Sequence, residues 1–120
     1  MIIKTYASIL LNDFDQKKNL LSINKFRKGP AHYKIWLLVM NNYFNKINTP
    51  LESVMTLLSK NISRKTAGII LAELTDEQLI EKHKDVSDNR IITITPTERT
   101  IREFTEWIQI LKSELNSVQS

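Results

Sequence analysis

Apolar side chains recur every three or four residues along most of this chain, which is the spacing of one face of an α-helix. Such a stripe begins at the N-terminus, and Leu20, Leu21 and Ile23 extend it with a shifted phase. Gly29-Pro30 interrupts it, and residues 31–43 then predict a second helix that is apolar around much of its circumference. The N-terminal stripe consists of Ile2, Ile3, Tyr6, Ile9, Leu10 and Phe14.

Two shorter helices are predicted next, each with its own start signal. Thr49 is a suitable N-cap for residues 50–60, Pro50 suits the first turn, and Glu52 is placed to complete a capping box. Ser63 is a second good N-cap, and it predicts a helix over residues 64–78. The inward positions are Leu51, Val54, Met55, Leu57 and Leu58, followed by Ala67, Ile70, Leu71 and Leu74.

The period of the pattern then changes from helix to strand. Residues 79–84 and 90–95 are alternating or β-branched, and the polar segment 85–89 lies between them, so a β-hairpin is predicted. Pro96 ends the second strand, and Thr97 caps a last helix over residues 98–115. The expected fold class is therefore α+β: mainly helical, with a small β-hairpin.

Composition narrows the class of protein. The chain has 120 residues, of which 42% are hydrophobic and none is cysteine, so one domain without disulfides or thiolate metal sites is expected. No apolar run reaches the roughly 18 residues of a membrane span. Asp13 and Asp15 interrupt the N-terminal stripe, and no signal-peptide cleavage site follows. A cytoplasmic location is the simplest expectation.

Charge is unevenly distributed. The net charge is +4, and no acidic residue occurs between Asp15 and Glu52. A polyanion would be attracted to such a segment. Charge alone favours an ordinary solvated basic face over a binding site. The basic residues of this segment are Lys17, Lys18, Lys25, Arg27, Lys28, Lys34 and Lys46.

The order of the elements is that of a winged helix-turn-helix. In that fold the second helix of the pair lies in the DNA major groove, and the hairpin reaches the adjacent minor groove or phosphates. Helix pairs followed by a hairpin also occur in proteins that bind only other proteins. Element order alone therefore leaves DNA binding and protein binding equally open.

Particular motifs favour DNA. The segments Ile62-Ser63-Arg64-Lys65-Thr66-Ala67 and Leu74-Thr75-Asp76-Glu77-Gln78-Leu79-Ile80-Glu81-Lys82 precede Asp85-Val86-Ser87-Asp88-Asn89-Arg90, an Asp-x-x-Asp-x-Arg hairpin element, and Ile94-Thr95 follows. This series resembles the MarR family (multiple antibiotic resistance regulators), with a length close to that of the short SarA-type members. The resemblance implies a dimeric, sequence-specific transcriptional regulator that binds double-stranded DNA and is not an enzyme.

The resemblance also implies which residues contact DNA. Arg64 and Lys65 begin the recognition helix, where cations oppose the helix dipole and so suggest a function. Arg90 is expected in the minor groove, with Asp88 orienting it, and Lys82, His83 and Lys84 are secondary phosphate contacts. The full expected set is Ser63, Arg64, Lys65, Thr66, Gly68, Ile69, Lys82, Lys84, Asp88 and Arg90.

Three positions depart from the family pattern or interrupt a helix. Gln78 replaces the usual Gly before the first hairpin strand, so the helix is expected to end without a left-handed residue. Ile69 replaces a polar residue, and its side chain suits a thymine methyl group. Gly68 lies inside the helix, and close packing against the preceding helix is its favoured explanation over close approach to DNA.

Dimerisation is assigned to the terminal helices, residues 1–28 and 97–117, around a core of residues 31–95. Readers of DNA with one helix pair usually bind two half-sites as dimers, although these stripes can instead pack together within one protomer. The expected interface consists of Ile2, Ile3, Tyr6, Ile9, Leu10, Ile101, Phe104, Trp107, Ile108 and Leu111.

Other chemistry is not expected. His32 and His83 are the only histidines and lack metal-ligand spacing, and no catalytic or cofactor motif is present. Tyr33, Trp36 and Trp107 are better explained as core than as a ligand pocket. Two alternatives to a regulator remain: a plasmid or phage replication or partition protein, and a winged-helix adaptor that binds protein. The sequence names no small-molecule effector.

Overall fold

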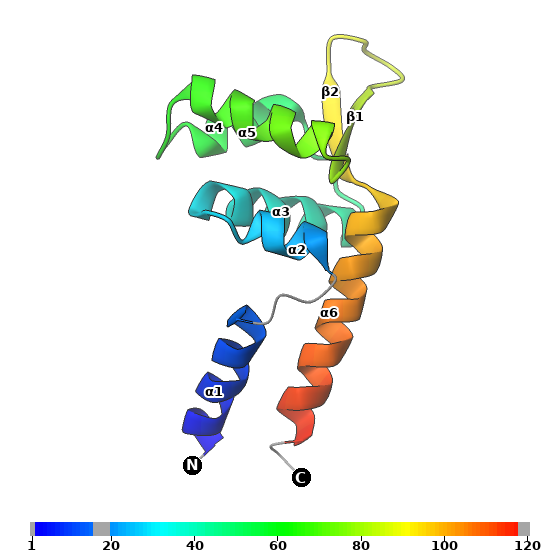
Figure 1. Ribbon diagram of the computed structural model, residues 1–120. Coiled ribbons are helices and arrows are strands. Elements are labelled where there is room, and N and C mark those ends of the chain that lie inside the picture. Colours follow the sequence, from blue (N-terminus) through cyan, green and yellow to red (C-terminus); the bar gives the residue numbers. More distant parts are fainter. Residues whose placement is uncertain (1, 16–19, 118–120) are drawn as a thin grey trace.

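The computed structural model describes residues 2–15 and 20–117, and this part of the chain is mainly helical with one antiparallel hairpin (Figure 1). The expected α+β class is confirmed at this level. The elements are α1 (Ile2–Asp15), α2 (Leu21–Phe26), α3 (Pro30–Phe44), α4 (Leu51–Leu58), α5 (Arg64–Asp76), β1 (Ile80–Lys84), β2 (Ile92–Pro96) and α6 (Glu98–Ser117).

The buried core centres on Trp36 of α3, which is 1% exposed. Its ring stacks on Phe26 of α2 with centroids 5.8 Å apart, and it meets Phe104 and Trp107 of α6 at 5.4 and 5.3 Å. Aromatic pairs at these separations add specific contacts to simple burial. The core continues through α4, α5 and the hairpin with Val54, Leu58, Ala67, Leu71, Leu74, Ile80 and Ile94.

The N-terminal stripe does not continue as one helix. The structure separates α1, which ends at Asp15, from α2, which begins at Leu21. Ile23 and Phe26 are buried in the core, whereas Leu21 is 61% exposed. The expected extension of the stripe across residues 20–23 is therefore wrong. The buried face of α2 is set by its packing on α3 and α6 and does not continue the apolar face of α1. Segment 1–28 contributes to the core as well as to a terminal helix.

The segment before α4 pairs with β2 through one isolated bridge, and its threonine does not cap the helix. Pro50 forms an isolated antiparallel bridge with Thr93, and Thr49 O accepts a hydrogen bond from Ile94 N at 2.8 Å. Thr49 Oγ1 accepts from Asn42 Nδ2 at 3.0 Å, and α4 has no side-chain cap. The predicted Thr49–Glu52 capping box is wrong, since Thr49 is held in extended pairing beside β2.

The hairpin matches its prediction closely. Its register runs from Ile80 opposite Pro96 to Lys84 opposite Ile92. The second strand begins two residues later than expected, because Asp85 N bonds Ile91 O at 2.8 Å and Ile91 N bonds Asp88 O at 3.0 Å within the turn.

The end of α5 differs from the expectation for Gln78. Its φ is 61°, in the left-handed region. Gln78 N donates to Thr75 O, and Leu79 N donates to Leu74 O, both at 3.0 Å. This is the Schellman pattern, normally built around glycine. The helix therefore ends through a left-handed residue after all, with glutamine in that position.

The elements divide between two ends of the molecule (Figure 1). The two chain termini lie at one end, where α1 packs beside the C-terminal part of α6. The other end carries α4, α5 and the hairpin, whose tip projects past α5. The N-terminal and C-terminal helices therefore lie together at one end of the molecule. The expected DNA-contacting residues, on α5 and the hairpin, lie at the other end.

Candidate nucleic-acid interface

Ser63 fixes the start of α5, as predicted. Its Oγ accepts a hydrogen bond from Thr66 N at 3.0 Å and donates to Thr66 Oγ1 at 2.9 Å. This cap places Arg64 and Lys65 in the first, exposed turn. The structure thereby puts both cations at an exposed helix start, where their charge opposes the helix dipole.

The two cations differ in their surroundings. Arg64 Nη2 lies 2.6 Å from Glu52 Oε1 and 2.7 Å from Oε2, so an acidic residue of α4 holds it. Lys65 makes no ion pair within the described part of the chain. Sequence reasoning missed the role of Glu52, since its position after Thr49 suggested a capping box instead.

The exposed face of α5 continues through Ile69, which is 57% exposed. An exposed apolar side chain of this size on a mostly polar helix face suits contact with a thymine methyl group. Gly68 is beside it. A Cβ built there would lie 3.9 Å from Met55 Cε, an ordinary contact distance. A Cβ would therefore fit at this position, so the packing of α5 on α4 does not require glycine there.

At the hairpin tip, Asp88 and Arg90 form the expected pair. Arg90 Nε donates to Asp88 Oδ1 at 3.1 Å, Nη2 donates to Oδ2 at 3.0 Å, and the backbone N of Arg90 also donates to Oδ1. The side-chain hydrogen bond from Arg90 lowers the pKa of Asp88, so the carboxylate stays charged. The Arg90 side chain is nevertheless 90% exposed, so it is held but accessible.

The remaining hairpin candidates lie on β1. Lys82 and Lys84 are exposed at alternating positions, which places them on one face of the strand with buried Ile80 at its base. His83 is on the opposite face, where its Nε2 is 2.8 Å from Thr95 Oγ1. The two lysines are therefore available to phosphates on the same side of the hairpin.

Three cations of the acid-free segment, Lys25, Arg27 and Lys28, are paired with acids in the fold, whereas Lys34 and Lys46 are exposed and form no ion pair among the described residues. Arg27 Nη2 pairs with Asp13 Oδ2 of α1 at 2.6 Å. Lys25 pairs with Glu73 of α5, and Lys28 Nζ lies 3.6 Å from the same carboxylate. Acids distant in sequence therefore match these three cations, which favours a structural role for them. Lys17 and Lys18 lie outside the described residues.

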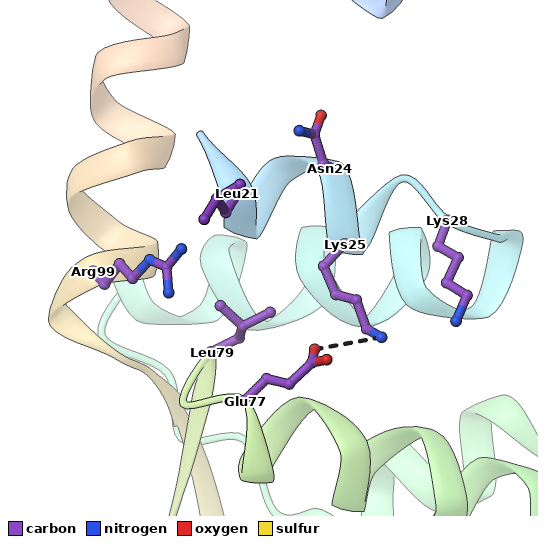
Figure 2. Close-up of a pocket in the computed structure, with 7 residues that line it drawn as sticks. All are labelled: Leu21, Asn24, Lys25, Lys28, Glu77, Leu79 and Arg99. Atoms are coloured by element: carbon purple, nitrogen blue, oxygen red, sulfur yellow. Dashed lines mark ion pairs between the residues drawn. The ribbon is translucent and has the colours of Figure 1, made fainter. Parts of the chain in front are cut away.

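Figure 2 shows the groove beside this cluster, with a volume of about 590 Å³ between α2, the end of α5 and the start of α6. Lys25 Nζ reaches across to Glu77 Oε2 at 3.4 Å. Arg99 Nε donates to Glu103 Oε2 at 2.9 Å. In Figure 2, Leu79 lies between Arg99 and the Lys25–Glu77 pair. The charged side chains that line the groove already have partners. The ion pairs of Lys25 with Glu73 and Glu77 join α2 to α5, which favours a structural role for this groove.

A second groove, of about 710 Å³, separates α1 from the start of α3. Arg27 lies in it, with its guanidinium carbon 5.7 Å from the ring centre of Phe14 and 5.1 Å from that of Trp107. Tyr33 also lines the groove, whereas Trp36 is buried in the core. The core interpretation thus holds for Trp36, but Tyr33 and Trp107 border an open space.

The expected dimer residues differ in how far they are buried within one chain. Phe104 and Trp107 pack on Trp36 of the same chain, and Trp107 Nε1 donates to Asp13 Oδ1 at 2.8 Å. Ile2 and Ile3 lie on α1, with side chains outside the described part. Tyr6, Ile9, Ile101 and Leu111 are partly buried, Leu10 and Ile108 are exposed, and Leu11 and Phe14, which the expected set omitted, are each 64% exposed.

Within the described residues, no group of three His, Asp or Glu side chains is arranged to hold a metal ion. None of the described helices is long and apolar enough to cross a membrane. Comparison with protein-family models, with curated proteins and with solved structures found no match to this chain.

Proposed function

We propose that this protein is a dimeric, sequence-specific DNA-binding transcriptional regulator of the MarR type. In this proposal α4 and α5 are the helix pair, and β1 and β2 are the wing of a winged helix-turn-helix. The observation that carries it is the hairpin-tip pair. Asp88 fixes Arg90 through two side-chain hydrogen bonds, yet the Arg90 side chain is 90% exposed at the end that also carries α5 (Figure 1).

The arrangement supports a division of labour between α5 and the hairpin. The first turn of α5 would enter the major groove, with Arg64 and Lys65 reaching base edges or phosphates and Ile69 reaching a thymine methyl group. Arg90 would extend to the flanking minor groove, where narrow A·T tracts attract arginine. A two-fold partner would place a second α5 about 34 Å away, one turn along the duplex.

Selection of bound duplexes from a random library, followed by footprinting, tests this function. We expect a palindromic site. Arg64→Ala and Lys65→Ala should each weaken binding to it, by about 1–3 kcal/mol where a bidentate guanine contact is lost. Lys112→Ala is the matched control, because Lys112 is an exposed cation in the C-terminal part of α6, and that part of α6 lies away from α5 (Figure 1).

Each alternative has its own outcome. Unchanged affinity of both α5 variants for the selected site would remove α5 from the major groove. Absence of any saturable, salt-dependent binding to DNA would instead favour a protein-binding adaptor. A selected site found only at replication origins or partition loci would favour the replication or partition alternative.

A further inference from the structure

The pairing of Glu52 with Arg64 joins the first turns of α4 and α5. Arg64 Nη2 contacts both carboxylate oxygens, at 2.6 and 2.7 Å. The Nε and Nη1 groups of Arg64 have no hydrogen-bond partner among the described residues. The Glu52 contact thus uses one nitrogen of the guanidinium and leaves the donors of the other two nitrogens available.

This pair contributes little to the stability of the fold. The Arg64 side chain is 56% exposed and that of Glu52 is 70% exposed. Exposed ion pairs are screened by water and salt and stabilise a fold only weakly. Loss of the Glu52 side chain should change the free energy of unfolding little, because most of this side chain is exposed to solvent. The pair is therefore expected to affect what binds to the exposed starts of α4 and α5 rather than the stability of the fold.

A carboxylate beside the leading cation of α5 has two effects on DNA binding. It cancels the charge of Arg64 and repels phosphates, so it weakens binding that depends on charge alone. It also restrains the guanidinium through Nη2, and a restrained arginine loses less conformational freedom when it donates to a base. Guanine O6 and N7 are the acceptors that arginine prefers in the major groove.

We propose that Glu52 is a specificity-determining, positioning residue: it holds Arg64 so that Nε–H or Nη1–H faces a base edge, and it disfavours contacts to phosphate alone. This inference rests on the proposed DNA-binding function. Glu52 itself does not contact DNA in this proposal, and its effect on base preference requires Arg64.

Competition binding with Glu52→Gln tests the proposal, using the selected duplex, its single-base substitutions and an unrelated duplex. We expect affinity for the unrelated duplex to rise several-fold and its salt dependence to steepen by about one unit of slope. Preference at one base pair should fall roughly 5-fold or more. Glu98→Gln is the matched control, because Glu98 is an exposed acid in the first turn of α6. It should leave base preference unchanged.

The dependence on Arg64 separates positioning from a general change of charge. In an Arg64→Ala background, Glu52→Gln should produce no further loss of base preference. Unaltered preference in Glu52→Gln, together with relaxed preference in Arg64→Ala, would overturn the role of Glu52 and leave the proposed function standing. If the wild-type protein binds no duplex in a saturable, salt-dependent way, both fail. Thermal unfolding of Glu52→Gln should match that of Glu98→Gln.

Discussion

Glu103 on α6 accepts two hydrogen bonds from Ser22 at the start of α2, although 81 residues separate them in sequence. Oε1 lies 2.9 Å from Ser22 N and 2.7 Å from Ser22 Oγ, and Oε2 accepts from Arg99. Burial alone would raise the pKa of Glu103, but the bonds from Ser22 and Arg99 outweigh it and the pKa is lowered. A buried carboxylate therefore fastens α2 to α6.

Glu103→Ala should destabilise the protein by about 2–3 kcal/mol, because it leaves the buried Ser22 donors without an acceptor. Glu103→Gln keeps an acceptor for Ser22 and should cost about 1 kcal/mol. Urea unfolding measures both. Glu106→Ala is the control, since Glu106 is exposed on the same helix. Equal stability of Glu103→Ala and Glu106→Ala would contradict the fastening role.

Gln78→Gly should stabilise the protein by about 1 kcal/mol. Gln78 is in the left-handed region with φ of 61°, where a Cβ is unfavourable and glycine has no such penalty. The gain is partly offset by the greater freedom of glycine in the unfolded chain. Gln78→Ala, which retains the Cβ, should give no comparable gain in thermal unfolding.

Lys46 provides an independent repeat of this experiment. It ends α3 with φ of 57°, and its neighbour Ile47 donates from N to Asn42 O at 2.8 Å. Lys46→Gly should therefore also be stabilising. A loss of stability in both glycine variants would show that the side chains contribute more than the backbone strain costs.

The helix periods, the polar turn and the Ser63 cap could be predicted from the sequence because each depends on neighbouring residues. The Asp88–Arg90 pair was predictable for the same reason. The roles of Thr49 and Glu52 were not, since Thr49 is decided by pairing with Ile94 and Glu52 by contact with Arg64, on another helix.

The acid-free segment shows the same limit for charge. The sequence places Arg27 and Lys25 far from any acid, but the fold brings Asp13 of α1 and Glu73 of α5 to them. Local composition therefore overstated the exposed positive charge. Tertiary pairing of this kind has no signal in residue spacing.

Stability should fall as the pH drops below about 6.5, through His32. Burial lowers the pKa of His32 from 6.5, although Glu73 opposes this, and Lys25 and Lys28 add to it. Between the two pKa values the unfolded chain binds a proton that the folded chain does not, so the free energy of unfolding decreases as pH falls. Glu77 also faces this cluster and favours the protonated form.

Urea unfolding at pH values from about 7.5 to 5 measures the slope, since histidine is the side chain that ordinarily titrates there. His32→Gln should flatten the dependence. His83→Gln is the control because His83 is exposed on β1. An identical slope in His32→Gln and wild type would assign the dependence to another group.

Light scattering should report about twice the 14.0 kDa of the chain at micromolar concentration, as the proposed dimer requires. Leu11 of α1 is 64% exposed at the end that carries both termini, so Leu11→Glu should yield a folded monomer. Leu37→Glu is the control, since Leu37 is 44% exposed on α3. A wild-type monomer that binds its selected site tightly would contradict this interface.

Arg90→Ala should reduce affinity for all DNA sequences, and most for sites with A·T-rich flanks. Arg90 is at the hairpin tip with its side chain 90% exposed, so its loss removes a cation that reaches beyond the groove assigned to α5. The salt dependence should flatten by about one unit of slope. Asp88→Ala should weaken the preference for A·T-rich flanks without lowering general affinity, because Asp88 orients Arg90 through its two oxygens and its removal also takes away a carboxylate that repels phosphates.

Arg90→Lys is the matched variant, since it keeps the charge but cannot form the same planar pair with Asp88. It should retain the salt slope and lose part of the preference for A·T-rich flanks. Thermal unfolding should barely change in any of the three variants, because an exposed pair contributes little to stability. If Arg90→Ala binds A·T-rich sites as tightly as wild type but unfolds several degrees lower, the pair is structural, and the DNA-binding proposal loses the observation that carries it.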